Sequence, residues 1–163
     1  MCFYSIGKTF NAAAFVCGYS VCKDPYLRDQ LAEETSLSHY NDLNVFSMHA
    51  MYGGFDRGGE WVDELQQVLS ENVDYAYNFV KTNWPEIKVA KPEGTYMFFI
   101  DCEEWCKKHD VTIDELQTRG VEYGVIWQDG RPFGGDYTIR INLALPLGKM
   151  KEAFDRLKEY VFV

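Results

Sequence analysis

A single lysine in a short polar turn near the N-terminus could do chemistry. Lys8 lies within residues 5–11, a segment that contains one glycine and is followed by an apolar stretch at 12–16. Burial disfavours the charged form of a lysine and lowers its pKa, which yields a free amine that can form a Schiff base with an aldehyde. Most lysines near an N-terminus are solvated surface charges, so Lys8 taken alone does not establish a catalytic role.

A second candidate, Arg140, lies far along the chain. Apolar residues alternate with other residues from 137 to 145, which predicts a half-buried strand. Arg140 and Asn142 fall on the face opposite the apolar one, so they project together. An arginine there can hold a carboxylate through two parallel hydrogen bonds, or it can belong to an ordinary solvated strand face. The strand pattern leaves both interpretations open.

The composition is that of a folded, acidic protein. The chain has 163 residues, of which 47% are hydrophobic, so it can bury a sizeable core. Its formal net charge of −9 argues against nucleic-acid and anionic-membrane partners, which need basic clusters. Five cysteines without regular spacing are typical of free thiols in a reducing compartment. The apolar run at 12–17 is too short to span a bilayer, and we expect a soluble, cytoplasmic protein.

Three potential metal ligands lie close together in the sequence. Cys102, Cys106 and His109 would share one face of a helix if their segment is helical. The chain has no C-x-x-C pair, and a fourth ligand is not evident. We therefore expect no metal here. We also expect His109 and the isolated His39 and His49 to be structural or surface residues.

The first half of the chain is predicted to be mostly helical. Asp24 can cap a helix that runs from Pro25 to about residue 34. A second helix is expected at 43–52, ended by the two glycines at 53–54. The longest helical pattern follows a further glycine pair and stops before Pro85.

The second half is predicted to combine strands and helices in an α/β domain. Its expected elements, in order, are a strand at 95–100, a helix from Thr112 to Gly120 that opens with a capping box, a strand at 121–127, the strand that carries Arg140, and a helix that begins after Pro146. A turn is expected at Asp129 and Gly130.

Four motifs connect the candidate residues with a known family. They are Ser-x-x-Lys-Thr-Phe-Asn at 5–11, Lys-Pro-Glu-Gly-Thr-Tyr at 91–96, Asp-Gly-Arg-Pro-Phe-Gly-Gly at 129–135 and Arg-Ile-Asn-Leu-Ala-Leu-Pro at 140–146. In this order and spacing, the chain resembles the C-terminal part of a fold-type I pyridoxal-phosphate (PLP) enzyme. It is most similar to the MalY/PatB-type C–S β-lyases (cystathionine β-lyases) of the class I/II aminotransferase family.

The resemblance implies a role for each candidate residue. Lys8 would form the Schiff base with pyridoxal 5'-phosphate and move the α-proton, and Ser5 would help to hold the cofactor phosphate. Arg140 would bind the α-carboxylate of an amino-acid substrate. The implied fold is an aminotransferase-like small α/β domain at 58–163, a short sheet with covering helices. It would follow a mostly helical remnant of the PLP-binding large domain at 1–57.

The resemblance also implies a reaction and an assembly. The leading expectation is a C–S β-lyase that releases thiol, pyruvate and ammonia from cystathionine or related cysteine conjugates, in a homodimer. A class I/II aminotransferase is the alternative; many of these carry a phosphate-binding arginine shortly after the lysine, whereas residues 15–19 contain none. A third alternative is a non-catalytic domain that acts through protein contacts or dimerisation.

Family members are more than twice as long as this chain. Their N-terminal part supplies the aspartate that pairs with the pyridinium nitrogen, the aromatic residue that stacks on the ring, and further phosphate ligands. The resemblance therefore implies that the chain is a C-terminal fragment. We expect weak or absent cofactor binding and no useful turnover from the chain alone.

Overall fold

The computed structural model describes residues 1–38 and 42–163, so the expectation for His39 lies outside the described residues. The chain forms two compact units, Met1–Leu65 and Gln66–Val163. The boundary between them falls inside helix α4 (Gly59–Asn83), whereas the division proposed from the sequence, between residues 57 and 58, lies just before the start of that helix. The assignment of 1–57 to a large domain and 58–163 to a small domain stays a prediction.

The first unit contains a β-hairpin that the sequence analysis did not predict. Strands β1 (Cys2–Ser5) and β2 (Gly18–Val21) pair antiparallel, with Tyr4 opposite Tyr19 and their rings stacked at 5.3 Å between centroids. Between the strands lie helix α1 (Ile6–Thr9) and the 3-10 turn η1 (Ala13–Phe15). Nearly every residue of these two strands is exposed, so they lack the buried apolar face that produces a period-two pattern in the sequence.

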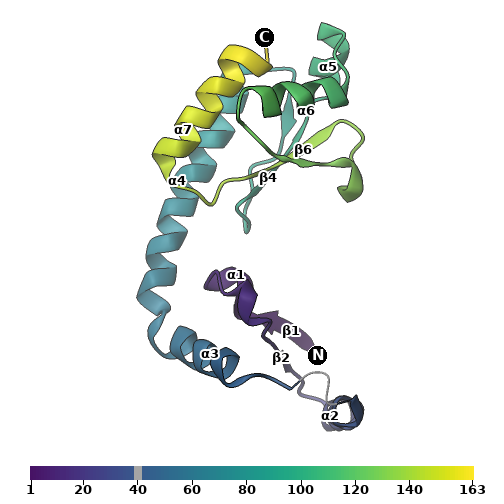
Figure 1. Cartoon of the computed structure of the whole chain (residues 1–163), viewed down its shortest axis with the longest axis vertical. Helices are drawn as coiled ribbons and strands as arrows, with labels where there is room; N and C mark the ends of the chain where they lie inside the picture. The colour runs from purple at the N-terminus through teal and green to yellow at the C-terminus, as the bar shows by residue number, and fades with distance from the viewer. Residues whose placement is uncertain (39–41) are drawn as a thin grey trace. The chain divides into compact units, whose positions relative to one another are not determined.

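Helices α2 (Pro25–Ser38) and α3 (Val45–Arg57) complete the first unit before the start of α4 (Figure 1). The predicted cap of α2 is confirmed, because the Asp24 carboxylate accepts hydrogen bonds from the backbone N–H groups of Tyr26, at 2.9 Å, and Leu27, at 3.3 Å. Helix α2 is longer than expected.

The prediction that Gly53 and Gly54 end a helix is wrong. Helix α3 continues through both glycines to Arg57, and Gly58 is its C-cap. The Phe10 ring explains why glycine occurs here: a Cβ atom on Gly54 would lie 3.0 Å from that ring, and one on Gly58 would lie 2.5 Å from Phe10 Cε1. These glycines allow an aromatic side chain to approach the helix backbone closely.

The second unit is built on a four-stranded antiparallel sheet with the strand order β3-β4-β6-β5. Its elements are β3 (Lys88–Val89), β4 (Met97–Asp101), α5 (Glu103–His109), α6 (Ile113–Glu122), β5 (Gln128–Asp129), the 3-10 turn η2 (Arg131–Phe133), β6 (Thr138–Asn142), α7 (Leu147–Arg156) and the π-helical turn η3 (Leu157–Val161), together with most of α4 (Figure 1). The α/β class, the strand near 95–100, the strand that carries Arg140 and the final helix are confirmed.

One face of this sheet is buried in the core of the second unit. Phe98 and Ile100 of β4 and Ile139 of β6 have no exposed surface, and they belong to a single cluster with buried residues of α4, α6, α7 and η3. Asn72, buried in α4, donates hydrogen bonds to the carbonyl oxygens of Leu143 and Leu145 at 2.8 and 2.9 Å. The segment that leaves β6 is thereby fixed to the longest helix.

Two further expectations for the second unit are wrong. The predicted strand at 121–127 does not form, because α6 extends to Glu122 and the chain becomes a strand only at Gln128. Gly120 is not a C-cap; it lies inside α6, where a Cβ atom would clash with the Trp127 ring. The capping box of Thr112 and Glu115 is confirmed. No helix in the described part of the chain is long and apolar enough to cross a membrane.

Candidate active site

Ser5 and Lys8 lie together at α1 of the first unit, and Arg140 lies on β6 of the second. Ser5 has extended backbone geometry and is the N-cap of α1, and Lys8 lies in the same single helical turn. Ile6, the first residue of that turn, is 1% exposed, which fixes the turn to its unit. The Lys8 side chain is exposed, so the partial burial expected from the apolar stretch at 12–16 is not found in this chain.

Aromatic packing holds the lysine-bearing turn in place. Phe10, two residues after Lys8, stacks on Trp61 at 6.3 Å and meets the Phe55 ring edge-on at 5.8 Å. Phe55 also meets Tyr19 of the hairpin at 5.6 Å. Because the Phe10 ring packs against Phe55 and Trp61, the backbone at Lys8 is held in place. The Lys8 side chain itself is exposed to solvent.

The Ser5 hydroxyl already has two partners within the first unit. Its oxygen accepts a hydrogen bond from the Gly7 N–H at 3.0 Å, and the hydroxyl donates to the Cys17 carbonyl oxygen at 2.8 Å. A hydroxyl has one hydrogen to donate. Ser5 can therefore donate to a phosphate oxygen only by giving up its bond to Cys17, and its predicted role as a phosphate ligand stays a prediction.

Arg140 lies between two partners that carry no charge. Its Nη1 donates to Gln128 Oε1 at 2.7 Å, and its guanidinium carbon lies 4.5 Å from the centroid of the Phe133 ring. Gln128 is directly opposite Arg140 in the β5–β6 register, so the two side chains share a face of the sheet. No carboxylate in the described residues forms an ion pair with Arg140, which leaves its positive charge available.

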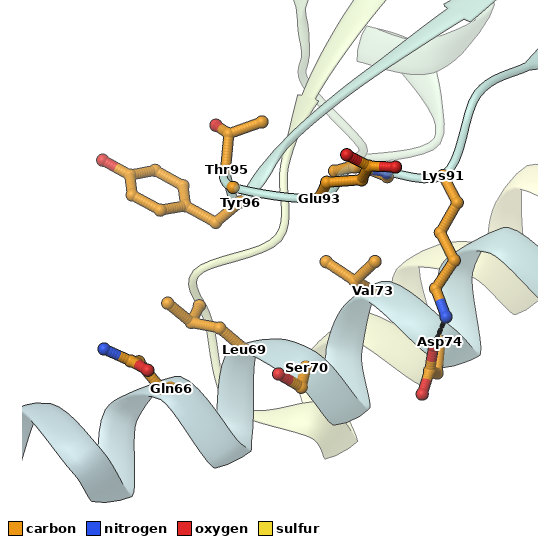
Figure 2. A pocket seen from close by; sticks show the side chains of 11 residues that line it. Gln66, Leu69, Ser70, Val73, Asp74, Lys91, Glu93, Thr95 and Tyr96 are labelled. Carbon is orange, nitrogen blue, oxygen red and sulfur yellow. Dashed lines mark ion pairs between the residues drawn. The ribbon is translucent and has the colours of Figure 1, made fainter.

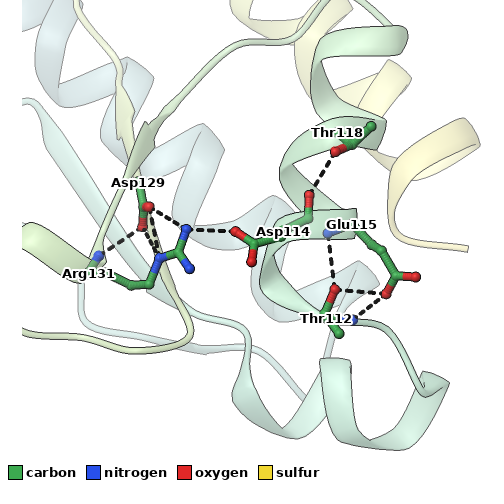
Figure 3. Close-up of polar contacts among 6 residues, drawn as sticks. All are labelled: Thr112, Asp114, Glu115, Thr118, Asp129 and Arg131. Carbon is green, nitrogen blue, oxygen red and sulfur yellow. Dashed lines mark hydrogen bonds and ion pairs between the residues drawn. The ribbon is translucent and has the colours of Figure 1, made fainter.

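The neighbouring Arg131 is neutralised instead. Its Nη2 lies 2.7 Å from both Asp114 Oδ1 and Asp129 Oδ2, and its Nε donates to Asp129 Oδ2 at 2.8 Å (Figure 3). The hydrogen bond from the Arg131 side chain holds the pKa of Asp129 at about 2, well below its usual value. The same contacts raise the pKa of Arg131. This cluster joins the 129–135 motif to the first turn of α6.

Close backbone approach explains the glycines of that motif. A Cβ atom on Gly130 or Gly135 would clash with Thr138, the first residue of β6. Gly130 N–H donates to the Thr138 carbonyl oxygen at 2.9 Å, and the Thr138 hydroxyl donates to the Gly135 carbonyl oxygen at 2.8 Å. The loop is thus folded back onto the strand of Arg140, and Phe133 lies within it.

The 91–96 motif borders a pocket of about 560 Å³ in the second unit. Figure 2 shows Lys91 reaching from the loop to Asp74 of α4, with which it forms an ion pair, while Thr95 and Tyr96 lie on the other side of the pocket. Leu69 and Val73 contribute an apolar floor from α4. The motif therefore forms the wall of a cavity against the long helix.

Cys102 and Cys106 are core residues. Both are buried, and burial raises the pKa of each thiol. The His109 ring stacks on Trp105 at 4.3 Å, and its Nδ1 lies 2.8 Å from the Trp105 carbonyl oxygen. Among residues 1–38 and 42–163, no three potential ligands are arranged to hold a metal ion.

Lys8 and Arg140 are candidates from the sequence, whereas the residues that contact the guanidinium were not among its predictions. Gln128 was included in no predicted element, and Phe133 was noted only as part of a motif. The one signal that could have found Gln128 is its place in a strand opposite Arg140, but β5 has only two residues.

Known proteins match the chain over almost its whole length. It is 27% identical to cystathionine beta-lyase PatB of Bacillus subtilis over 93% of this chain and 39% of PatB, and 24% identical to the asparagine–oxo-acid transaminase of Streptococcus mutans over 96% of this chain and 39% of that protein. A PLP-bound protein of Clostridium difficile superposes with a TM-score of 0.84 at 30% identity, over 96% of this chain and 40% of that one.

The chain thus spans about two fifths of the length of these relatives. The family model for aminotransferase class I and II matches residues 1–157, which include all four sequence motifs. On this evidence the chain belongs to the class I and II aminotransferase family.

Proposed function

We propose that the protein containing this chain is a PLP-dependent C–S β-lyase acting on cystathionine or a similar cysteine conjugate. The products would be a thiol, pyruvate and ammonia. The observation that carries the proposal is the pair of available cationic groups: an exposed Lys8 amine and an Arg140 guanidinium that no described carboxylate neutralises. They occur in a chain with 27% identity to a cystathionine beta-lyase.

Each group has a definite task in this chemistry. Bound PLP supplies an electron sink for charge that develops at the α-carbon of an amino acid. The Lys8 Nζ would bind the cofactor covalently and then carry the α-proton. Arg140 would bind the α-carboxylate through the Nε–Nη2 edge of its guanidinium, because Nη1 is used by Gln128. The residues present fit the cofactor, since the Lys8 amine is accessible.

An aminotransferase is the second candidate. The similarity to the transaminase of Streptococcus mutans favours it, at an identity only slightly below that to PatB. Both reactions need the lysine and the arginine, so neither residue separates them. The absence of an arginine at 15–19 favours the lyase.

Product analysis of the full-length protein separates the two. With L-cystathionine and PLP, we expect stoichiometric release of pyruvate and thiol without any added keto acid. Lys8→Arg keeps the positive charge and should lower this rate at least about 100-fold, because the proton carrier is displaced. Amino transfer to a keto acid without thiol release would reject the lyase assignment in favour of the aminotransferase.

A further inference from the structure

Two arginines nine positions apart in the second unit have opposite electrostatic environments. Arg131 is bound by the carboxylates of Asp114 and Asp129. Arg140 is bound by a side-chain amide and an aromatic face, neither of which carries a charge. A neutral hydrogen-bond acceptor can fix the orientation of a guanidinium without cancelling its charge.

The two neutral contacts restrict Arg140 in complementary ways. Gln128 occupies Nη1 at one corner of the guanidinium, and the guanidinium carbon lies over the Phe133 ring, 4.5 Å from its centroid. The described residues make no hydrogen bond to Nε or Nη2. These two nitrogens form the edge that can bind a carboxylate through two parallel hydrogen bonds.

Phe133 is not held in its position by packing in the core, which is the usual reason for an aromatic residue in a folded protein. It is 53% exposed, so burial of its ring contributes little to the core of the second unit. Its placement nevertheless depends on a well-connected loop, in which Arg131 holds the start of η2 to α6 and Thr138 holds the loop to β6. The fold of the loop therefore places the exposed Phe133 ring against the Arg140 guanidinium.

We propose that Gln128 and Phe133 are positioning residues for Arg140, which orient its guanidinium and keep its Nε–Nη2 edge and its charge free for a substrate carboxylate. The part that concerns the substrate rests on the proposed function. The part that concerns the guanidinium does not, and it can be tested on this chain alone.

The first experiment is side-chain NMR of the 163-residue chain with ¹⁵N-labelled arginine, in which Arg140→Lys identifies the Arg140 signals. In the wild-type chain we expect side-chain protons of Arg140 shifted by the ring of Phe133, and an ordered Nε–H group. Phe133→Leu should abolish the shift, and Phe133→Tyr should keep it. Gln128→Leu should lower the order of the Nε–H group. Arg140 signals that are the same in the wild type, Phe133→Leu and Gln128→Leu would overturn the proposal.

The second experiment measures KM and kcat for L-cystathionine in the full-length protein. Phe133→Leu and Gln128→Leu should each raise KM about 2- to 10-fold with kcat within about 2-fold, whereas Phe133→Tyr should keep KM within about 2-fold of the wild type. Gln128→Glu is the matched variant, because it preserves the length and the acceptor but adds a charge. It should keep the Arg140 Nε–H ordered and still raise KM more than about 10-fold, since its carboxylate competes with the substrate.

The outcomes separate the two hypotheses. A wild-type KM in Gln128→Glu would show that the neutrality of this position is irrelevant, and would overturn the proposal. If the wild-type full-length protein releases neither pyruvate nor thiol, the proposed function fails, and the NMR result alone then decides whether Gln128 and Phe133 position the guanidinium.

Discussion

At the scale of single residues, hydrogen bonds between the charged side chains of Asp129 and Arg131 fix the loop beside Arg140. Asp129 accepts a backbone hydrogen bond from Arg131 at 3.0 Å in addition to those of the guanidinium. The charged form of Asp129 is therefore favoured in the folded protein, where its pKa is about 2. In the unfolded chain an aspartate has a pKa of about 3.9.

This difference predicts an acid-dependent loss of stability. Since the folded-state pKa is depressed, the contribution of Asp129 is fully present above about pH 4 and is lost as the pH falls towards about 2. The free energy of unfolding of Asp129→Asn should lie below that of the wild type near neutral pH, and the gap should close on acidification. Urea unfolding of the chain at several pH values measures the gap.

The control for this prediction is Asp136→Asn. Asp136 is an exposed aspartate in the loop that follows the motif, and no ion pair is found for it among the described residues. Its substitution should leave the unfolding free energy close to that of the wild type at every pH. A pH-independent gap for Asp129→Asn would contradict the account of the Arg131 cluster.

The candidate residues themselves could be predicted from the sequence because their signals are local. Lys8 lies in a motif of seven residues, and Arg140 lies in an alternating strand. The contacts of Arg140 could not be predicted in this way. Gln128 contacts Arg140 because the register of β5 and β6 places the two residues opposite each other. Phe133 contacts Arg140 because a glycine-rich loop folds back onto β6. Both contacts depend on pairing between separate segments of the chain.

At the scale of elements, helix α3 shows how one side chain determines where glycine is needed. Phe10 packs against the backbone of α3 at Gly54 and Gly58, while Gly53 faces open space, with no atom within 4 Å of the position that a Cβ would take. The three glycines of this helical segment therefore have two kinds of environment, although the sequence presents them alike.

These environments predict opposite effects for the same substitution. Gly53→Ala should raise the stability of α3 by about 0.5–1 kcal/mol, because alanine favours the helix and meets no neighbour. Gly58→Ala should destabilise it by about 1–3 kcal/mol, because the Phe10 ring and the Gly54 carbonyl must move. Native-state hydrogen exchange of the α3 amides measures both changes. Equal effects of the two substitutions would contradict this packing.

The elements predicted correctly are those whose signals lie within a single segment of the chain. Long helical patterns such as α4, and the capping box of Thr112 and Glu115, are encoded within their own segments and were found. The β1–β2 hairpin and the two-residue β5 are defined mainly by their partner strands and were missed. Residues 121–127 are apolar enough for a strand, but α6 takes the first of them and Trp127 packs against Gly120.

At the scale of the whole molecule, the two units differ in how completely they bury their apolar side chains. The core cluster of the second unit contains twenty buried residues, from Val73 to Phe162. The first unit exposes several large apolar side chains instead, among them Phe3 at 70%, Tyr26 at 71% and Phe46 at 77%. A contiguous exposed apolar surface is typical of an interface, and we propose that the lysine-bearing unit packs against further protein surface.

Covalent binding of PLP to Lys8 is tested most directly by chemical trapping. The full-length protein would be incubated with PLP, reduced with sodium borohydride, digested and mapped by mass spectrometry. We predict a pyridoxyl group on the peptide that contains Lys8, and its loss in Lys8→Arg. A label on another lysine, or no label on the wild-type protein, would contradict the account.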